Sequence, residues 1–213
     1  MPESKIDLAR ATAETLAHYD TIAESFRERT HDHDVSQNIN ALLGAITVPA
    51  PADILDLGCG PGRDLKQFAA RGHRPVGVEG AAAFARMGRE AGFEVWEQNF
   101  LALDLPPSRF DGIFANATLF HVPTQELPRV LGQLFETLRP GGVLFSSNPH
   151  GQNEERFSNG RFGAFHDLAQ WRQFMTAAGF VELSYYYRPE GLPREEQPWL
   201  ASLWRKPGQK PGK

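Results

Sequence analysis

The chain contains 213 residues, 41% of them hydrophobic, which is enough for one domain with a full apolar core. Its formal net charge is −4 and it has no basic block in its body, so a broad nucleic-acid surface is disfavoured. It also lacks a run of about eighteen apolar residues and a leader-like apolar N-terminus, and we therefore expect a cytoplasmic protein without a membrane span.

The first fifty residues (1–50) are expected to form a helical cap or lid over the rest of the chain. Apolar side chains recur at mostly three- and four-residue spacing over residues 5–29, which predicts an amphipathic helix. A second helix is predicted from Val35 to Ile46, because a proline-rich stretch follows it.

The segment His31-Asp32-His33-Asp34 between these two helices contains residue types that bind metals. Alternate residues share one side only if the segment is extended, and no further ligand cluster is evident in the sequence. We therefore predict no metal site, and we place His33 in the polar wall of a substrate site.

A glycine-rich turn follows the first predicted strand. Asp53-Ile54-Leu55-Asp56-Leu57 reads as a short buried strand, Gly58-Cys59-Gly60-Pro61-Gly62 as a turn, and the residues up to Gly72 as a helix. Three glycines at alternate positions let the backbone approach a ligand closely. Cys59 is the only cysteine, which excludes an internal disulfide. Such a strand-turn-helix unit is typical of a doubly wound α/β sheet, whose ligands bind beyond the carboxyl ends of the strands.

The run Leu55-Asp56-Leu57-Gly58-Cys59-Gly60-Pro61-Gly62 resembles the signature of class I S-adenosylmethionine-dependent methyltransferases. The dinucleotide pattern G-x-G-x-x-G would require glycine at position 63, where Arg63 stands, so a nicotinamide-dependent oxidoreductase is disfavoured. The resemblance implies an α/β fold with a doubly wound, seven-stranded, mostly parallel sheet, an antiparallel C-terminal edge strand, and S-adenosylmethionine as the cofactor.

The next strands are expected to complete the cofactor site. Glu79 ends the strand 75–79, where a carboxylate can accept both ribose hydroxyls of a nucleoside, in this family or in a dinucleotide site. After the strand 93–96, the resemblance places Asn99 where an acid commonly accepts from the adenine amino group, and Phe100 along the adenine face or, alternatively, in the core. The expected cofactor-binding residues are Asp56, Gly58, Cys59, Gly60, Gly62, Arg63, Glu79, Gly80, Asn99, Phe100, Asn116 and Ala117.

The strand 110–115 leads to Asn116-Ala117-Thr118-Leu119-Phe120-His121, where the resembling family brings the methyl group to its acceptor. His121 is the candidate general base, since an unperturbed imidazole titrates near pH 6.5. The alternative is a histidine that shapes the loop or contacts the cofactor. By resemblance Tyr19 touches the methionine end of the cofactor and is the second catalytic candidate, and its alternative is a core-edge aromatic.

A helical stripe over 127–138 and the turn Arg139-Pro140-Gly141-Gly142 lead into the strand 143–148. The polar stretch 149–166 has no clear pattern and is expected to be a lid, or a surface loop pinned by its aromatic side chains. The residues expected to contact the substrate are Asn148, His150, Arg161 and His33.

Asp167 is expected to cap a helix that ends at Gly179. The segments 180–187 and 199–204 then read as an antiparallel pair of strands at the sheet edge. The catalytic domain is accordingly expected over 51–205, followed by a disordered tail over 206–213 that is rich in proline, glycine and lysine.

These features together predict an enzyme that transfers a methyl group to a nitrogen, oxygen or sulfur atom of a small polar metabolite, as a monomer or homodimer. Two alternatives remain open: a module that binds S-adenosylmethionine or S-adenosylhomocysteine without catalysis, and an RNA methyltransferase. The sequence does not identify the acceptor, because this fold hosts many activities.

Overall fold

The computed structural model describes residues 7–208 of the chain. Its helices are α1 (Leu8–Thr30), α2 (Ser36–Ala45), α3 (Arg63–Ala70), α4 (Ala82–Glu90), α5 (Leu127–Thr137) and α6 (Leu168–Ala177), with short 3-10 helices η1 (Phe100–Ala102), η2 (Leu119–His121) and η3 (Arg194–Glu196). Its strands are β1 (Asp53–Leu57), β2 (Arg74–Glu79), β3 (Val95–Glu97), β4 (Phe110–Asn116), β5 (Leu138–Pro149), β6 (Glu154–Ser158), β7 (Arg161–Phe165), β8 (Val181–Arg188) and β9 (Trp199–Arg205). Among these residues, no helix combines the length and apolar character needed to span a bilayer.

Seven strands form one sheet in the order β3-β2-β1-β4-β5-β9-β8. The strands from β3 to β5 run parallel, whereas β9 runs antiparallel to both β5 and β8, so the predicted α/β fold with an antiparallel pair at its C-terminal edge is confirmed. The chain order reverses between β1 and β4. A ligand site is expected beyond the carboxyl ends of the strands at this point.

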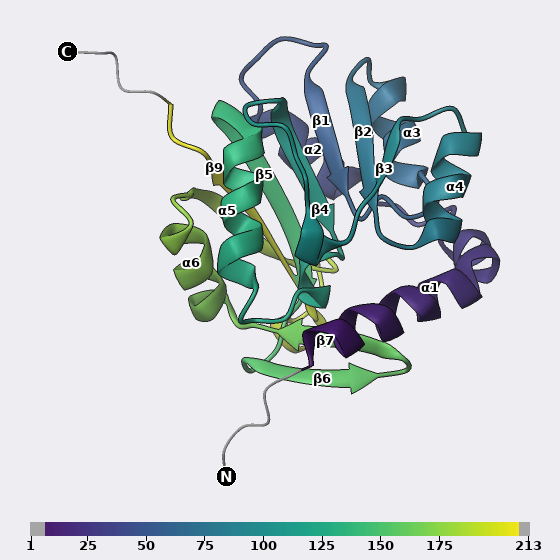
Figure 1. Ribbon diagram of the computed structural model, residues 1–213. Coiled ribbons are helices and arrows are strands. Elements are labelled where there is room, and N and C mark those ends of the chain that lie inside the picture. The colour runs from purple at the N-terminus through teal and green to yellow at the C-terminus, as the bar shows by residue number, and fades with distance from the viewer. Residues whose placement is uncertain (1–6, 209–213) are drawn as a thin grey trace.

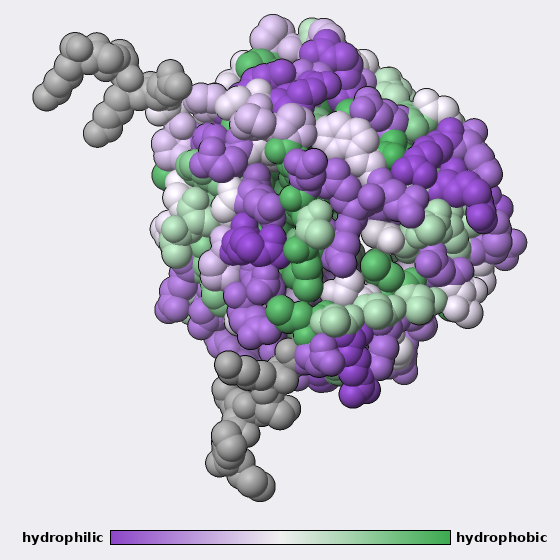
Figure 2. All heavy atoms as spheres, viewed as in Figure 1, coloured by the Kyte–Doolittle hydropathy of each residue, from purple (hydrophilic) through white to green (hydrophobic). Residues whose placement is uncertain are grey.

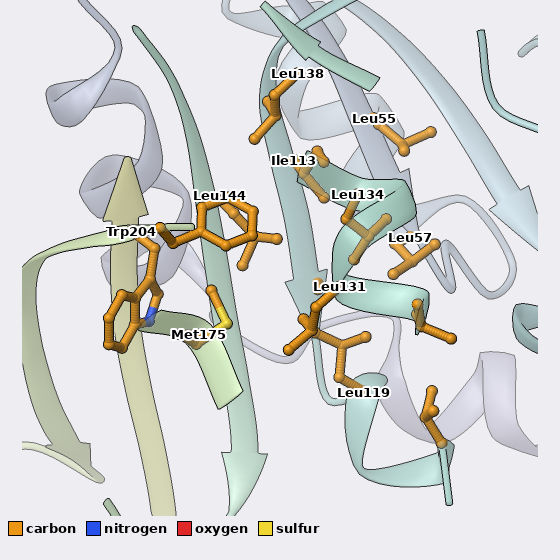
Figure 3. Close-up of a cluster of buried hydrophobic side chains, with 14 of the residues drawn as sticks. Leu55, Leu57, Ile113, Leu119, Leu131, Leu134, Leu138, Leu144, Met175 and Trp204 are labelled. Atoms are coloured by element: carbon orange, nitrogen blue, oxygen red, sulfur yellow. The ribbon is translucent and has the colours of Figure 1, made fainter. Parts of the chain in front are cut away.

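The core forms because strand residues alternate between two buried faces of the sheet. On one face, Leu55, Ile113 and Leu144 pack against α5 and α6 (Figure 3). On the other face, Ile54 and Phe114 pack against α2 and α3. Helices therefore cover both faces, which leaves the strand ends as the place for a site (Figure 1).

The structure corrects two predicted segments. The stretch 149–166 is not patternless, because β6 and β7 pair within it as an antiparallel hairpin. Strand β5 begins at Leu138, five residues before the predicted start at 143, and includes the segment predicted to be a turn. It begins there because Leu138 pairs with Phe110 of β4, and Gly141 and Gly142 then exchange backbone hydrogen bonds with Lys206.

The N-terminal segment expected to be a single cap consists of two different parts. Helix α2 buries Ile39 and Leu42 against the sheet and so belongs to the core. Only α1 lies across the strand ends, with its first half beside the β6–β7 hairpin and its second half beside α4 (Figure 1). At the other end, Lys206 is held by hydrogen bonds to the Phe135 and Leu138 carbonyl oxygens, while residues 1–6 of the cap and 209–213 of the expected tail lie outside the described residues.

Candidate active site

A cavity of about 660 Å³ lies at the carboxyl ends of the parallel strands. The glycine turn after β1, the end of β2, η1 and the segment after β4 form its floor, and α1 and the start of β7 form its roof. Figure 2 draws the same side of the molecule as Figure 1, and it shows hydrophobic residues in the middle of a mostly hydrophilic surface. The cavity is large enough for a small-molecule ligand, since such sites usually measure 300–1,000 Å³.

The glycine turn depends on residues without a side chain. Gly58 has φ of +71°, and a Cβ atom there would lie 2.5 Å from the Thr118 Oγ1 atom. Gly60 also has a positive φ, +52°, but a Cβ atom there would meet nothing within 4 Å. The first glycine is therefore required for packing against the segment after β4, and the second leaves backbone open to the cavity.

Glu79 fixes the turn from the adjacent strand. Its Oε2 atom accepts a hydrogen bond from the Gly60 N–H at 2.9 Å, and its Oε1 atom accepts from the Ala81 N–H at 2.8 Å. Burial raises the pKa of this carboxyl group. The carboxylate sits at the strand end and lines the cavity, where it can also meet the hydroxyls of a bound ribose.

Two further carboxylates lie close to the turn. Asp56 is buried with its Oδ2 atom unpaired among the described residues, and burial raises its pKa well above the usual range. Asp64 at the start of α3 is paired with Arg63 at 2.7 Å. Asp56 is not part of the cavity lining. Asp64 and Glu79 line this end together with one basic side chain, Arg63, so the lining is acidic on balance, which fits the positively charged sulfonium and ammonium groups of S-adenosylmethionine.

The end of β3 provides the residues predicted to face adenine. Asn99 and Phe100 both line the cavity. The Asn99 Oδ1 atom accepts a hydrogen bond from the Leu101 N–H at 2.8 Å and so caps η1. Phe100 is half-buried and packs against the main core, which agrees with its alternative assignment as a loop anchor and leaves the adenine contact a prediction.

The end of β4 has an unusual backbone. Ala117 has φ of +59°, which is uncommon for a residue with a side chain. Its N–H donates to the Ser147 carbonyl oxygen, and the neighbouring Asn116 Oδ1 atom accepts from Asn38 on α2. The strained turn directs the following residues, including His121, toward α1.

Tyr19, His121 and Arg161 meet at the roof. The His121 Nδ1 atom lies 2.7 Å from the Phe162 carbonyl oxygen, which requires a proton on Nδ1 and leaves Nε2 as an acceptor. The Tyr19 hydroxyl, 2.9 Å from Nε2, therefore donates to His121 and accepts from Arg161 Nη1 at 3.2 Å. Burial lowers the pKa of His121 to about 4, so its imidazole is neutral at neutral pH.

The four predicted substrate contacts separate into two groups. His33 and Arg161 line the cavity. Asn148 lies outside its lining and accepts a hydrogen bond from the Phe120 N–H at 3.2 Å, while His150 also lies outside and packs edge-on against Tyr187.

Sequence reasoning missed Phe120, Arg188 and Trp199, which also line the cavity. Phe120 stood within the predicted active-site segment, so its position was available as a signal. Arg188 ends β8 and Trp199 begins β9, and the two residues are paired in the sheet. Nothing in the local sequence indicated that they face the site.

Comparison with known proteins identifies the family. A family model described as a methyltransferase domain matches residues 26–185. The chain belongs to this methyltransferase family. The resemblance noted at the glycine turn is thus confirmed.

Individual relatives of this methyltransferase domain match it to different extents. A trans-aconitate 2-methyltransferase of Azoarcus sp. (strain BH72) is 36% identical over 116 residues, covering 53% of the chain and 45% of that protein. An uncharacterized methyltransferase of Geobacillus thermodenitrificans (strain NG80-2) is 26% identical and covers 77% of both chains. The chain spans about half the length of the trans-aconitate relatives it matches.

Two solved structures share the fold of this methyltransferase domain. The 1,6-didemethyltoxoflavin-N1-methyltransferase of Burkholderia thailandensis, solved with 1,6-didemethyltoxoflavin and S-adenosylhomocysteine, has a TM-score of 0.77 at 22% identity and covers 97% of this chain and 93% of its own. The [4+2]-cyclase SpnF has a TM-score of 0.76 at 15% identity, with coverage of 97% and 100%.

Proposed function

We propose that this chain transfers a methyl group from S-adenosylmethionine to a nitrogen, oxygen or sulfur nucleophile of a small polar metabolite. The observation that carries the proposal is the glycine turn, which opens beside the buried Glu79 carboxylate into a cavity of about 660 Å³. Membership of the methyltransferase family supports the reaction type. The relatives named for trans-aconitate and 1,6-didemethyltoxoflavin support a small-molecule acceptor.

When bound, S-adenosylmethionine supplies a methyl group activated by a positively charged sulfur. In our proposal Glu79 holds the ribose hydroxyls, and the backbone at Gly58 and Gly60 lies against the methionine part. The protein then acts mainly by orienting the acceptor toward the methyl group, and positioning of this kind can supply up to about 7–11 kcal/mol of the barrier reduction.

The roof residues exclude water and shape the acceptor end. His121 holds Tyr19 in place, because its Nε2 lone pair accepts the tyrosine O–H. An acceptor proton therefore reaches His121 only by way of the Tyr19 oxygen. Since the pKa of His121 is lowered to about 4, this end suits an acceptor that arrives already deprotonated, and His121 positions rather than deprotonates.

The proposal is tested first by calorimetry with three compounds. S-adenosylmethionine and S-adenosylhomocysteine are expected to bind the purified chain, while NAD is expected not to bind. Absence of binding by both sulfur compounds would end the proposal. Release of S-adenosylhomocysteine in the presence of a metabolite extract then tests catalysis.

The same assay separates the remaining alternatives. A module that only binds the cofactor would show affinity and no turnover on any acceptor, and the [4+2]-cyclase SpnF shows that a related fold also carries an enzyme named for other chemistry. An RNA methyltransferase would turn over with tRNA and not with metabolites. We propose a cytoplasmic enzyme, monomeric or homodimeric, that does not act on nucleic acid, and size-exclusion chromatography tests its assembly.

A further inference from the structure

Arg161 is a cation in the cavity wall without an acidic partner. It begins β7 and is half-buried. Its Nη1 atom donates to the Tyr19 hydroxyl, and its Nε atom is buried without a hydrogen-bond partner among the described residues. None of the ion pairs formed within residues 7–208 includes Arg161. A partly desolvated guanidinium in this state lacks the compensation that a carboxylate normally provides.

The groups around Arg161 do not supply a negative charge either. The titratable side chains that sense it are those of His18, Tyr19 and His121. Burial lowers the pKa of both histidines and raises the pKa of Tyr19, so all three are neutral at neutral pH. Glu79 also acts on Tyr19, but of these two charges only Arg161 is hydrogen-bonded to the Tyr19 hydroxyl.

The hydrogen bonds at this corner all run in one direction. Arg161 donates to Tyr19, Tyr19 donates to His121, and His121 donates to the Phe162 carbonyl oxygen. The Tyr19 oxygen, the His121 Nε2 atom and the Phe162 carbonyl oxygen each accept a hydrogen bond within the protein, and the guanidinium of Arg161 keeps further N–H donors. A ligand that presents oxygen lone pairs and negative charge matches this corner, and a cationic ligand does not.

The lining at the glycine turn has the reverse character, since Glu79 lines the cavity there and the one basic side chain, Arg63, is already paired with Asp64. One end thus suits the cationic cofactor and the other suits an anion. We propose, on the basis of the function proposed above, that the methyl acceptor is a small organic anion whose negatively charged group binds the Arg161 guanidinium. Arg161 then contributes to the choice of acceptor, together with Arg188, which also lines the cavity and has a buried Nε atom without a partner among the described residues.

The test divides a cell metabolite extract by anion exchange into a retained, anionic fraction and an unretained fraction. Each fraction is incubated with the enzyme and S-adenosylmethionine labelled in its methyl group. Labelled product is expected from the retained fraction alone. A product found only in the unretained fraction, or no product from the retained fraction, would overturn the proposal.

Variants of Arg161 then test the residue itself. With the acceptor found, Arg161→Gln is expected to raise KM about 100-fold, the scale for losing one member of a desolvated charge pair, and Arg161→Lys to recover part of this loss. Arg156→Gln on the neighbouring strand β6 serves as the matched control, because Arg156 lies outside the cavity lining. Equal KM values for Arg161→Gln and Arg156→Gln would contradict the assignment.

Affinity for S-adenosylhomocysteine separates this proposal from the previous one. Calorimetry on Arg161→Gln is expected to give a dissociation constant within about twofold of the unmodified chain, which also shows that the variant is folded. If the unmodified chain binds S-adenosylhomocysteine but methylates only neutral or cationic compounds, the anion proposal fails and the cofactor assignment stands. If S-adenosylhomocysteine does not bind, the proposed function fails.

Discussion

At the scale of single residues, Gly58 and Gly60 make different demands on the turn although both have positive φ. We predict that Gly58→Ala lowers the free energy of unfolding by about 2 kcal/mol or more, since strain at positive φ adds to a clash with Thr118. Gly60→Ala is the matched control, because it carries the φ strain alone. Chemical denaturation of both variants measures the difference, and equal losses would show that the contact with Thr118 is unimportant.

Glu79 and Glu97 end neighbouring strands in the same register, but only Glu79 lines the cavity. We predict that Glu79→Gln weakens S-adenosylhomocysteine binding at least tenfold, or about 1.4 kcal/mol. The glutamine side chain has only one acceptor oxygen, whereas the two carboxylate oxygens of Glu79 each accept a backbone N–H group, so one of these hydrogen bonds would be lost. Glu97→Gln should leave the affinity unchanged. Calorimetry decides the question, and similar affinities for the two variants would remove Glu79 from the cofactor site.

At the scale of elements, Thr15 joins α1 to the hairpin. Its Oγ1 atom accepts from the Phe162 N–H at 2.9 Å and donates to the Ala11 carbonyl oxygen. We predict that Thr15→Val costs about 1–3 kcal/mol, because a buried N–H group loses its partner. The Phe162 amide should also exchange its hydrogen faster.

Thr21→Val on the same helix is the control, since its hydroxyl donates only to the exposed turn at Ala17. Hydrogen exchange followed by mass spectrometry compares the two variants. Unchanged protection of β7 in Thr15→Val would mean that other contacts hold the roof.

The β6–β7 hairpin could have been predicted from the sequence. Asn159 and Gly160 both have positive φ, 51° and 75°, and Asn-Gly between strand-forming residues is a strong signal for a two-residue hairpin turn. The polar composition of 149–166 concealed this signal. The strands β1 and β4 were predictable because each contains a short, mostly apolar run bounded by turn residues.

At the scale of the whole molecule, His121 and Asp53 are two of the groups whose shifted pKa values make stability depend on pH. Burial lowers the pKa of His121 from 6.5 to about 4, so the unfolded chain binds a proton more readily between these values. The free energy of unfolding is therefore expected to fall as the pH decreases from 6.5 to 4. His121→Asn should flatten this part of the curve, as measured by denaturation across the pH range. A curve that stays equally steep would assign the effect to other groups.

Asp53 affects stability at lower pH. It is the first residue of the interior strand β1, at the end of the strand away from the cavity. Arg74, Arg109 and Arg139 hold its pKa below the usual 3.8, and they connect β2, the residue before β4 and β5 to β1. A depressed carboxyl pKa stabilises the fold above the unfolded value and loses this effect as the pH falls below it. We predict that Asp53→Asn is destabilised at pH 7 and that its difference from the unmodified chain narrows below about pH 4. A constant difference would contradict the ion-pair network.

The site was predictable only where it is local. Residues 58–62 directly follow β1 and Glu79 is the last residue of β2, so their positions followed from the strand ends and the turn residues. The meeting of Tyr19 with Arg161 depends on how distant segments pack, and they are 142 positions apart in the chain. Residue spacing does not predict contacts over such a separation. The sequence therefore indicated Arg161 as a substrate contact but did not indicate which side chains it would meet.

This separation also has a consequence during translation. Tyr19 leaves the ribosome first, and Arg161 follows after a delay of roughly 7–28 s at about 5–20 residues per second. In that interval the nascent chain already carries the turn and the acid beside it, but not the hairpin that shelters them. The wall of the cavity that carries Arg161 is therefore the part synthesised last among these segments, and the Tyr19 hydroxyl gains its guanidinium donor only then.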